Sequence, residues 1–422
     1  MKLSSLLLRS FATAVLFITV SSCSEDLDSS GVCAVLCPPI GGEVQNITVD
    51  AVSFDTTVQS LSGLGAETGL LLASRGDSLD TRVVIRFDSI VSRFTPVGDT
   101  AQDIKTVDSA YIQLRLDTLA IKGDGPFTIE AYDVDTTAND TSTVAVAALF
   151  RPDRFISSQD FARTDLHDTT KYYISNAVVL AKLQGGAQLR VGLRVTGATS
   201  AQIPIFSGES GRTPLLFFRA TPDTVTKPLV VVPFSRTPTT DAIVAAHLTD
   251  YTVVVKGPPP APAGVLAVGG LPTRRTYMRF VIPSSIIDSS TIVRATLLLN
   301  QISNPALDPT DTVLIVPQLV TAGRAVTDPV KAAQIIADLS GDTVRVVPGN
   351  SGLTNVELAR ALIAWHLQPP DSLPRAIVLK TVIEGISISP LEIRFSPIED
   401  VVAALRPRLR ISYTSRVPLR IP

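Results

Sequence analysis

The sequence has little of the chemistry on which most enzymes and metalloproteins depend. Its 422 residues include only three Cys, three His, two Met and one Trp. A zinc site alone needs about four ligands, so the chain has few residues for a metal cage, haem ligation or thiol catalysis. Charged residues make up 18% of the chain and the formal net charge is -2. We therefore expect an ordered chain with no nucleic-acid partner and no cofactor.

Aromatic residues are also scarce, at 5% of the chain. Because sugars bind by stacking on exposed aromatic faces, this scarcity counts against a carbohydrate ligand. Recognition through hydrogen bonds from Arg, Asp and Asn remains open. The chain is nevertheless 45% hydrophobic, which is enough to build a core in each of two or three domains.

The N-terminus has the pattern of an export signal. Lys2 and Arg9 precede an apolar run at 11–20, which is too short to span a bilayer. The run closes on Val20-Ser-Ser-Cys23, which looks like a bacterial lipobox. Residues 1–22 are therefore predicted to be a lipoprotein signal peptide, with Cys23 lipidated. An ordinary signal peptide is the alternative.

The segment 23–44 is predicted to be a lipidated tether to the membrane. Its acidic run, Ser24-Glu-Asp-Leu-Asp28, resembles a surface-export signal, although a solvated tether would look the same. We expect an outer-membrane lipoprotein and leave surface exposure open. Cys33 and Cys37 remain as an even pair, for which a small disulfide loop is the favoured interpretation.

An internal repeat organises the rest of the chain. The segment Arg82-Val-Val-Ile-Arg86-Phe87 recurs as Arg275-Thr-Tyr-Met-Arg279-Phe280. Other markers recur in the same order: Asp55-x-x-Val58 with Asp241-x-x-Val244, Val107-x-x-Ala110 with Ile292-x-x-Ala295, Phe206-Ser207 with Phe395-Ser396, and Pro214-x-Leu216 with Pro407-x-Leu409. Collinear markers predict two copies of one domain. We place these domains at 45–220 and 228–414, with a polar linker at 221–228.

Local patterns within each copy predict strands. Residues 109–116 alternate, with Ala110, Ile112, Leu114 and Leu116 on one face, while 313–316 and 376–379 are continuous apolar runs. Many short strands without repeated helical crossovers predict an all-β fold of two tandem antiparallel β-sandwiches.

One or two short helices are expected in each copy. A capping box at Thr354–Glu357 predicts a helix through Trp365, and Asp328-Pro329 predicts another through Ala337. The single Trp is expected to pack in the core, with a ligand platform as the alternative.

Together these markers resemble the DNRLRE family of extracellular jelly-roll modules, which are relatives of carbohydrate-binding modules. The similar segments are Asp55-Thr-Thr-Val58, Arg82 to Asp88, Val107-Asp-Ser-Ala110, Thr354 to Trp365, Phe206-Ser-Gly-Glu209, Phe395-Ser396 with Glu399, and Arg406 to Tyr413. The first copy departs from the pattern because no Trp lies near 171–174. The resemblance implies tandem jelly rolls, an extracellular role and, for some members, polysaccharide binding. It implies no catalytic residues.

Several polar residues are candidates for a site. His167 lies in a polar cluster without a visible partner, so a solvated loop is favoured over a catalytic base. His247 and His366 have no visible partner either. Asp133, Asp135, Asn139 and Asp140 supply oxygen atoms at short spacing, as a calcium loop would, although an acidic turn fits as well.

The repeated arginines are the tentative ligand-binding residues. Within each pair, Arg82 with Arg86 and Arg275 with Arg279, the two side chains share one strand face. Their guanidinium groups suit the carboxylates of an acidic polysaccharide. The alternative is that they pair with acidic residues of neighbouring strands or loops.

Two functions follow from these observations. The first is a non-catalytic envelope lipoprotein that binds extracellular polysaccharide, and the second is a structural or adhesive surface protein that binds an envelope protein. No nucleophile with an adjacent base is visible, so we expect no enzyme activity. Aromatic and polar residues grouped on a concave sheet face would favour the glycan, whereas a convex apolar patch would favour a protein partner.

Overall fold

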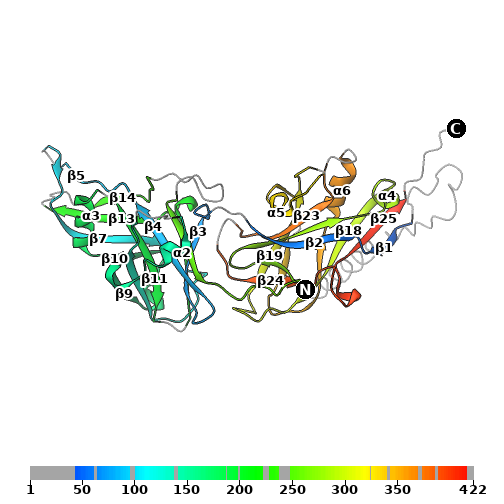
Figure 1. Ribbon diagram of the computed structural model, residues 1–422, viewed down its shortest axis with the longest axis horizontal. Coiled ribbons are helices and arrows are strands. Elements are labelled where there is room, and N and C mark those ends of the chain that lie inside the picture. Colours follow the sequence, from blue (N-terminus) through cyan, green and yellow to red (C-terminus); the bar gives the residue numbers. More distant parts are fainter. Residues whose placement is uncertain are drawn as a thin grey trace, which may run out of the picture.

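Two antiparallel β-sandwiches make up the computed structural model (Figure 1). The predicted all-β fold is confirmed. The structure describes residues 43–60, 64–95, 100–136, 141–186, 188–197, 200–221, 228–236, 248–323, 325–339, 343–368, 373–384 and 388–415. The signal peptide, Cys23, Cys33, Cys37 and the centre of the expected linker therefore lie outside the described residues.

The N-terminal sandwich has a seven-stranded sheet, with the order β12-β3-β4-β11-β8-β9 and β15 beside β4, and a four-stranded sheet, with the order β10-β7-β13-β14. Its strands are β3 (Gly69–Ser74), β4 (Asp80–Phe87), β7 (Thr106–Arg115), β8 (Phe127–Asp133), β9 (Phe155–Phe161), β10 (Thr169–Tyr173), β11 (Leu189–Thr196), β12 (Ala201–Phe206), β13 (Leu215–Thr221), β14 (Leu229–Val231) and β15 (Asp250–Lys256). A short ribbon, β5 (Arg93–Phe94) with β6 (Gln102–Asp103), and two helices, α2 (Thr143–Ala147) and α3 (Asn176–Gln184), complete it.

The C-terminal sandwich is formed by one twelve-stranded sheet. The long strand β18 pairs with β25 and with β24, and it thereby connects the two layers of the sandwich. Its strands are β1 (Gln45–Val49), β2 (Val52–Gln59), β16 (Leu266–Gly269), β17 (Arg274–Phe280), β18 (Ser290–Ile302), β19 (Val313–Val320), β20 (Ile336–Asp338), β21 (Val344–Val346), β22 (Gly352–Glu357), β23 (Ala376–Thr381), β24 (Glu392–Phe395) and β25 (Arg408–Ser415). Its helices are α4 (Ser284–Ile287), α5 (Pro329–Ala332) and α6 (Ala359–Leu367).

Each sandwich has an apolar core, and Leu71, Ala73 and Leu79 of the N-terminal sandwich pack into that of the C-terminal sandwich. In the N-terminal one, Ala110, Ile112, Leu114 and Leu116 all point inward, as their alternation predicted. The runs 313–316 and 376–379 form parts of β19 and β23, also as expected. Each fully buried Val, Leu, Ile or Phe side chain contributes about 1.5–3 kcal/mol to stability, so these two cores hold the fold together.

The helices differ in part from the expectation. Thr354 and Glu357 lie in strand β22, so the predicted capping box is wrong and helix α6 begins at Ala359. Trp365 is in that helix, buried and packed against Phe280 in the core, as predicted. Asp328 caps α5, but this helix ends at Ala332 because residues 336–338 join the sheet as β20.

The two sandwiches exchange their opening strands. β1 pairs with β25 and β2 with β17, both in the C-terminal sandwich, whereas β14 pairs with β13 and β15 with β4 in the N-terminal one. In Figure 1 the blue strand β2 lies among the yellow to red strands of the second sandwich. The strand pairing therefore crosses the expected boundaries at 45–220 and 228–414. The N-terminal sandwich runs continuously from β3 to β15.

The strand that corresponds to β2 in the second copy is β15. Val58 lies opposite Arg275, and Val253 lies opposite Arg82, so the strands have the same register against the repeated Arg-Phe segment. Asp55-Thr-Thr-Val58 thus matches Asp250-Tyr-Thr-Val253. The marker expected at 241–244 lies outside the described residues.

A polar cluster also joins the two sandwiches. Asp308, in the loop between β18 and β19, accepts hydrogen bonds from Arg75 and Lys122 of the N-terminal sandwich, both at 2.7 Å. Burial acts to raise the pKa of Asp308, but these bonds outweigh it and hold that pKa below its usual range. The carboxylate therefore stays ionised and binds both cations.

Candidate functional site

The repeated arginines Arg82 and Arg275 are used inside the fold. Both are buried, and each donates a hydrogen bond to the carbonyl at the C-terminal end of a short helix: Arg82 to Ala147 of α2, and Arg275 to Ala333 after α5. Cations are favoured at that end of a helix. Because both copies make the same contact, these residues hold the covering helices on their sheets.

Carboxylates complete the surroundings of these two guanidinium groups. Arg82 pairs with Asp80 at 3.0 Å and lies over the Phe150 ring, while Arg275 pairs with Glu384 at 2.7 Å. These contacts of Arg82 and Arg275 agree with the alternative interpretation of the sequence, in which the arginines pair with neighbouring acidic residues.

Arg86 and Arg279 also make contacts within the fold. Arg86 is 1% exposed and donates to the Tyr251 hydroxyl and to Ser235, both from the segment after the first copy. Arg279 is half-buried and donates to the Val326 carbonyl at 3.1 Å. The predicted ligand-binding arginines therefore do not converge on a common surface.

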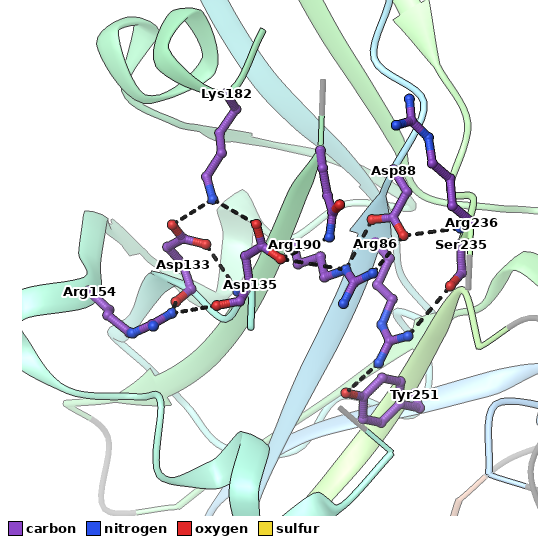
Figure 2. A network of polar contacts seen from close by, with 11 residues as sticks. Arg86, Asp88, Asp133, Asp135, Arg154, Lys182, Arg190, Ser235, Arg236 and Tyr251 are labelled. Atoms are coloured by element: carbon purple, nitrogen blue, oxygen red, sulfur yellow. Dashed lines mark hydrogen bonds and ion pairs between the residues drawn. The ribbon is translucent and has the colours of Figure 1, made fainter. Parts of the chain in front are cut away.

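A buried ion pair lies beside Arg86 (Figure 2). Arg190 on β11 binds both oxygens of Asp88, at 3.0 and 2.8 Å, and the two side chains are 4% and 0% exposed. Asp88 also accepts the backbone N–H of Arg236, at 3.1 Å. This network fastens the segment after β14 to the N-terminal sandwich, which is a structural role.

In the candidate calcium loop, cations of the chain itself contact Asp133 and Asp135. Lys182 lies 2.8 Å from Asp133 and 3.2 Å from Asp135, and Arg154 donates to the carbonyls of both (Figure 2). Asn139 and Asp140 lie outside the described residues. In the described part of the chain, no group of three or more His, Cys, Asp or Glu side chains is arranged to hold a metal.

The histidines form no catalytic arrangement among the described residues. His167 is exposed, and its backbone contacts the Thr170 hydroxyl. The ring of His366 contacts the Ile287 carbonyl at 2.7 Å. His247 lies outside the described residues.

A row of aromatic side chains crosses the outer face of the four-stranded sheet in the N-terminal sandwich. Tyr173 of β10 is opposite Tyr111 of β7, which is opposite Phe217 of β13, and Phe217 is opposite Val230 of β14. The neighbouring residues Tyr172, Ile112 and Leu216 point into the core. Because side chains alternate along a strand, the aromatic row points to solvent.

The rings of the row support one another. Tyr111 and Phe217 are stacked, with centroids 5.0 Å apart and planes at 10°, whereas Tyr173 is tilted by 57° from Tyr111 at 5.8 Å. Tyr173 is 54% exposed and Val230 is 50% exposed. Tyr173 therefore offers the most accessible ring of the row, and it packs against Tyr111, which stacks on Phe217.

Hydrogen-bonding groups surround this aromatic row. The ammonium group of Lys171 lies over the Tyr111 ring, 4.9 Å from its centre. Gln113 is opposite Lys171 on the same outer face, two residues along the strands from Tyr111 and Tyr173. Further along, Asp168 lies between Arg115 and Arg212, at 3.8 and 3.4 Å. The face thus combines apolar rings with amide and cationic donors.

The C-terminal sandwich shows that the fold does not need these aromatic residues. Tyr111 follows Ala110, and the residue that follows the equivalent Ala295 is Thr296. The row through Thr296 consists of polar residues, namely Glu357, Thr296, Arg410 and Thr48. The same sheet therefore forms without the rings, which points to a role for them other than folding.

The aromatic row was not predicted from the sequence because its members come from three separate strands. One local signal was present: each ring is adjacent to a residue with a clear inward pattern, such as Ile112. Alternation alone would have placed Tyr111 on the outer face. The register that aligns it with Tyr173 and Phe217 required the structure.

No helix in the described ranges combines the length and apolarity needed to cross a membrane. No protein-family model matches the chain. No curated protein matches it either.

Proposed function

We propose that this chain is a non-catalytic, cell-envelope polysaccharide-binding protein that contacts its ligand through the aromatic row of the N-terminal sandwich. The observation that carries this proposal is the difference between the two copies. Aromatic residues occupy outward-facing positions of the sheet in one copy, and polar residues occupy the equivalent positions in the other. These rings leave apolar surface in contact with water, which folding alone would not require.

The chemistry of the face suits a glycan. The Tyr173 ring can stack on the apolar face of a sugar, while Lys171 and Gln113 can donate hydrogen bonds to its hydroxyl or carboxylate groups. Arg115, Arg212 and Lys171 outnumber Asp168 on and beside this face, so an acidic polysaccharide is favoured over a neutral one. The resemblance to the DNRLRE modules supports the same class of ligand.

Replacing Tyr173 with Ala is expected to weaken glycan binding. The lost stacking is about 1 kcal/mol, or roughly a fivefold rise in Kd. A glycan array would select the polysaccharide, and calorimetry would compare the variants. The matched control is Phe155→Ala, which removes a 47% exposed ring from β9 in the other sheet of the same sandwich. Equal affinity of Tyr173→Ala and wild type would contradict the proposal.

A protein partner is the second candidate function. The observation that favours it is the apolar edge next to the row, where Val230, Val232 and Phe234 are 50%, 57% and 42% exposed. Such an edge suits a structural or adhesive role. Silence on the array, together with capture of an envelope protein that Val232→Asp abolishes, would support this alternative.

Anchoring through Cys23 is a separate proposal, and it rests on the lipobox-like sequence. Cys23→Ala is expected to release the protein from membranes and to leave an unlipidated precursor, because acyl chains supply about 0.8 kcal/mol for each buried methylene. Fractionation of membranes and mass spectrometry would show both. Unchanged membrane association would mean that another segment anchors the chain. Protease shaving of intact cells would test surface exposure.

A further inference from the structure

Two buried aspartates occupy equivalent positions on the exchanged strands. Asp55 on β2 is opposite Met278, and Asp250 on β15 is opposite Ile85. Their exposed fractions are 7% and 0%. Both copies thus place a carboxyl group inside the sandwich that receives the strand.

Each aspartate binds a loop of the receiving sandwich through one oxygen. Oδ2 of Asp55 accepts the backbone N–H of Ile398 at 2.9 Å, and Oδ2 of Asp250 accepts that of Gly208 at 2.8 Å. The other oxygen, Oδ1, has no hydrogen-bond partner among the described residues in either case. An unsatisfied buried acceptor is costly, so the protonation state of these groups matters.

The charged groups that face these aspartates are mainly acidic. Glu209, the residue after Gly208, and Glu67, before β3, face Asp250. Glu399, the residue after Ile398, faces Asp55. Arg274 lines the same cavity of about 300 Å³ as Asp55 and Glu399, but it pairs with Glu392. No described cation pairs with either aspartate.

Both carboxyl groups accordingly favour the protonated form. Burial, with a further contribution from Glu399, raises the pKa of Asp55 to about 6. Asp250 is more deeply buried, and burial together with Glu209 and Glu67 raises its pKa further. A protonated carboxyl group gains an O–H donor, which can bond to a facing glutamate.

We propose that Asp55 and Asp250 are proton-dependent latches, each of which fastens an exchanged strand to the loop after β24 or β12 of the receiving sandwich. In the protonated form the carboxyl group is neutral and can donate a hydrogen bond from Oδ1. In the ionised form a buried carboxylate without a paired cation lies near the more exposed glutamate of the loop, and the exchanged strand loosens.

The direction of the pH effect follows from the raised pKa values. A folded-state pKa above that of the unfolded chain means that the folded state binds more protons in the interval between them. The stabilisation is therefore complete below about pH 4 and is lost as the pH rises through the folded pKa, about 6 for Asp55 and higher for Asp250. Local opening of each strand is expected to increase by at most about tenfold per pH unit.

Hydrogen exchange of the soluble chain tests this proposal. Amide exchange in β2 and β15 would be followed between about pH 5 and pH 9, corrected for intrinsic rates, with β7 and β18 as internal references. We expect protection of β2 and β15 to fall with rising pH while the references stay constant. Asp250→Asn should remove the pH dependence of β15 only, and Asp55→Asn that of β2 only.

Further variants keep the test decisive. Asp103→Asn, at an exposed ion pair, is the control and should leave all profiles unchanged. If an Asn variant does not fold, Glu209→Gln should shift the loosening of β15 to lower pH, because it removes a facing charge. Protection that is independent of pH, or pH dependence that persists in the double Asn variant, would overturn the proposal. Recovery of protection at high pH on adding calcium would also overturn it, because the carboxylates would then hold a cation.

Discussion

Deleting residues 43–60 is expected to unfold the C-terminal sandwich and to leave the N-terminal sandwich folded. The deletion removes β1 and β2, which pair with β25 and β17. Val52 and Val58, both buried in the C-terminal sandwich, are lost with them. Burial of each valine contributes about 1.5–3 kcal/mol, and the backbone bonds of both strands are lost as well. The expected loss of several kcal/mol approaches the whole stability of a typical domain.

The single tryptophan makes this prediction easy to measure. Trp365 is 6% exposed in the core of the C-terminal sandwich, so its fluorescence reports that sandwich alone. Chains that begin at residue 43 and at residue 61 would be compared. The shorter one should show solvent-exposed Trp365 fluorescence together with a protease-resistant core that spans 64–256. Loss of the N-terminal sandwich with Trp365 still buried would contradict the strand exchange.

Removing Asp88 is expected to destabilise the N-terminal sandwich by about 3–5 kcal/mol, because a buried Arg190 loses its main carboxylate partner. Asp135, 3.9 Å from Arg190, is too distant to replace both hydrogen bonds. Asp88→Ala would be compared with wild type by urea unfolding followed by circular dichroism. Trp365 fluorescence should report an unchanged transition, since it lies in the other sandwich.

Two controls make the Asp88 result specific. Asp103→Ala breaks the exposed Arg93–Asp103 pair, whose side chains are 62% and 76% exposed, and should cost at most about 1 kcal/mol. The double variant Asp88→Leu with Arg190→Met replaces both charges by apolar groups and should recover most of the loss. A loss no larger for Asp88→Ala than for Asp103→Ala would show that the network contributes little.

The sequence predicted the β-sandwich class because local alternation, as at Ala110 to Leu116, is enough to identify strands and their inward faces. It did not predict the exchange. Asp55-Thr-Thr-Val58 and Asp250-Tyr-Thr-Val253 have the same pattern and fit either Arg-Phe strand. Which partner each strand takes depends on how the chain crosses between the sandwiches, and local patterns do not contain that information.

The candidate site, too, was predicted only in part from the sequence. The repeat correctly marked Arg82 and Arg275 as shared between the copies, and this sharing reflects the helices that they hold. The aromatic row belongs to one copy only, so the repeat contains no sign of it. Its composition was visible in the sequence, but the alignment of Tyr173 with Tyr111 depends on long-range strand register.

Calorimetric titration of the fragment 64–256 with the polysaccharide selected on the array is the most direct test of a glycan site on the N-terminal sandwich. This fragment contains the whole N-terminal sandwich, including β14 and β15, and the complete aromatic row. We predict that it folds alone and binds with the same affinity and stoichiometry as the full soluble chain, and that Tyr173→Ala weakens both proteins equally. A folded fragment that does not bind, while the full chain does, would place the glycan site elsewhere and contradict the proposed function.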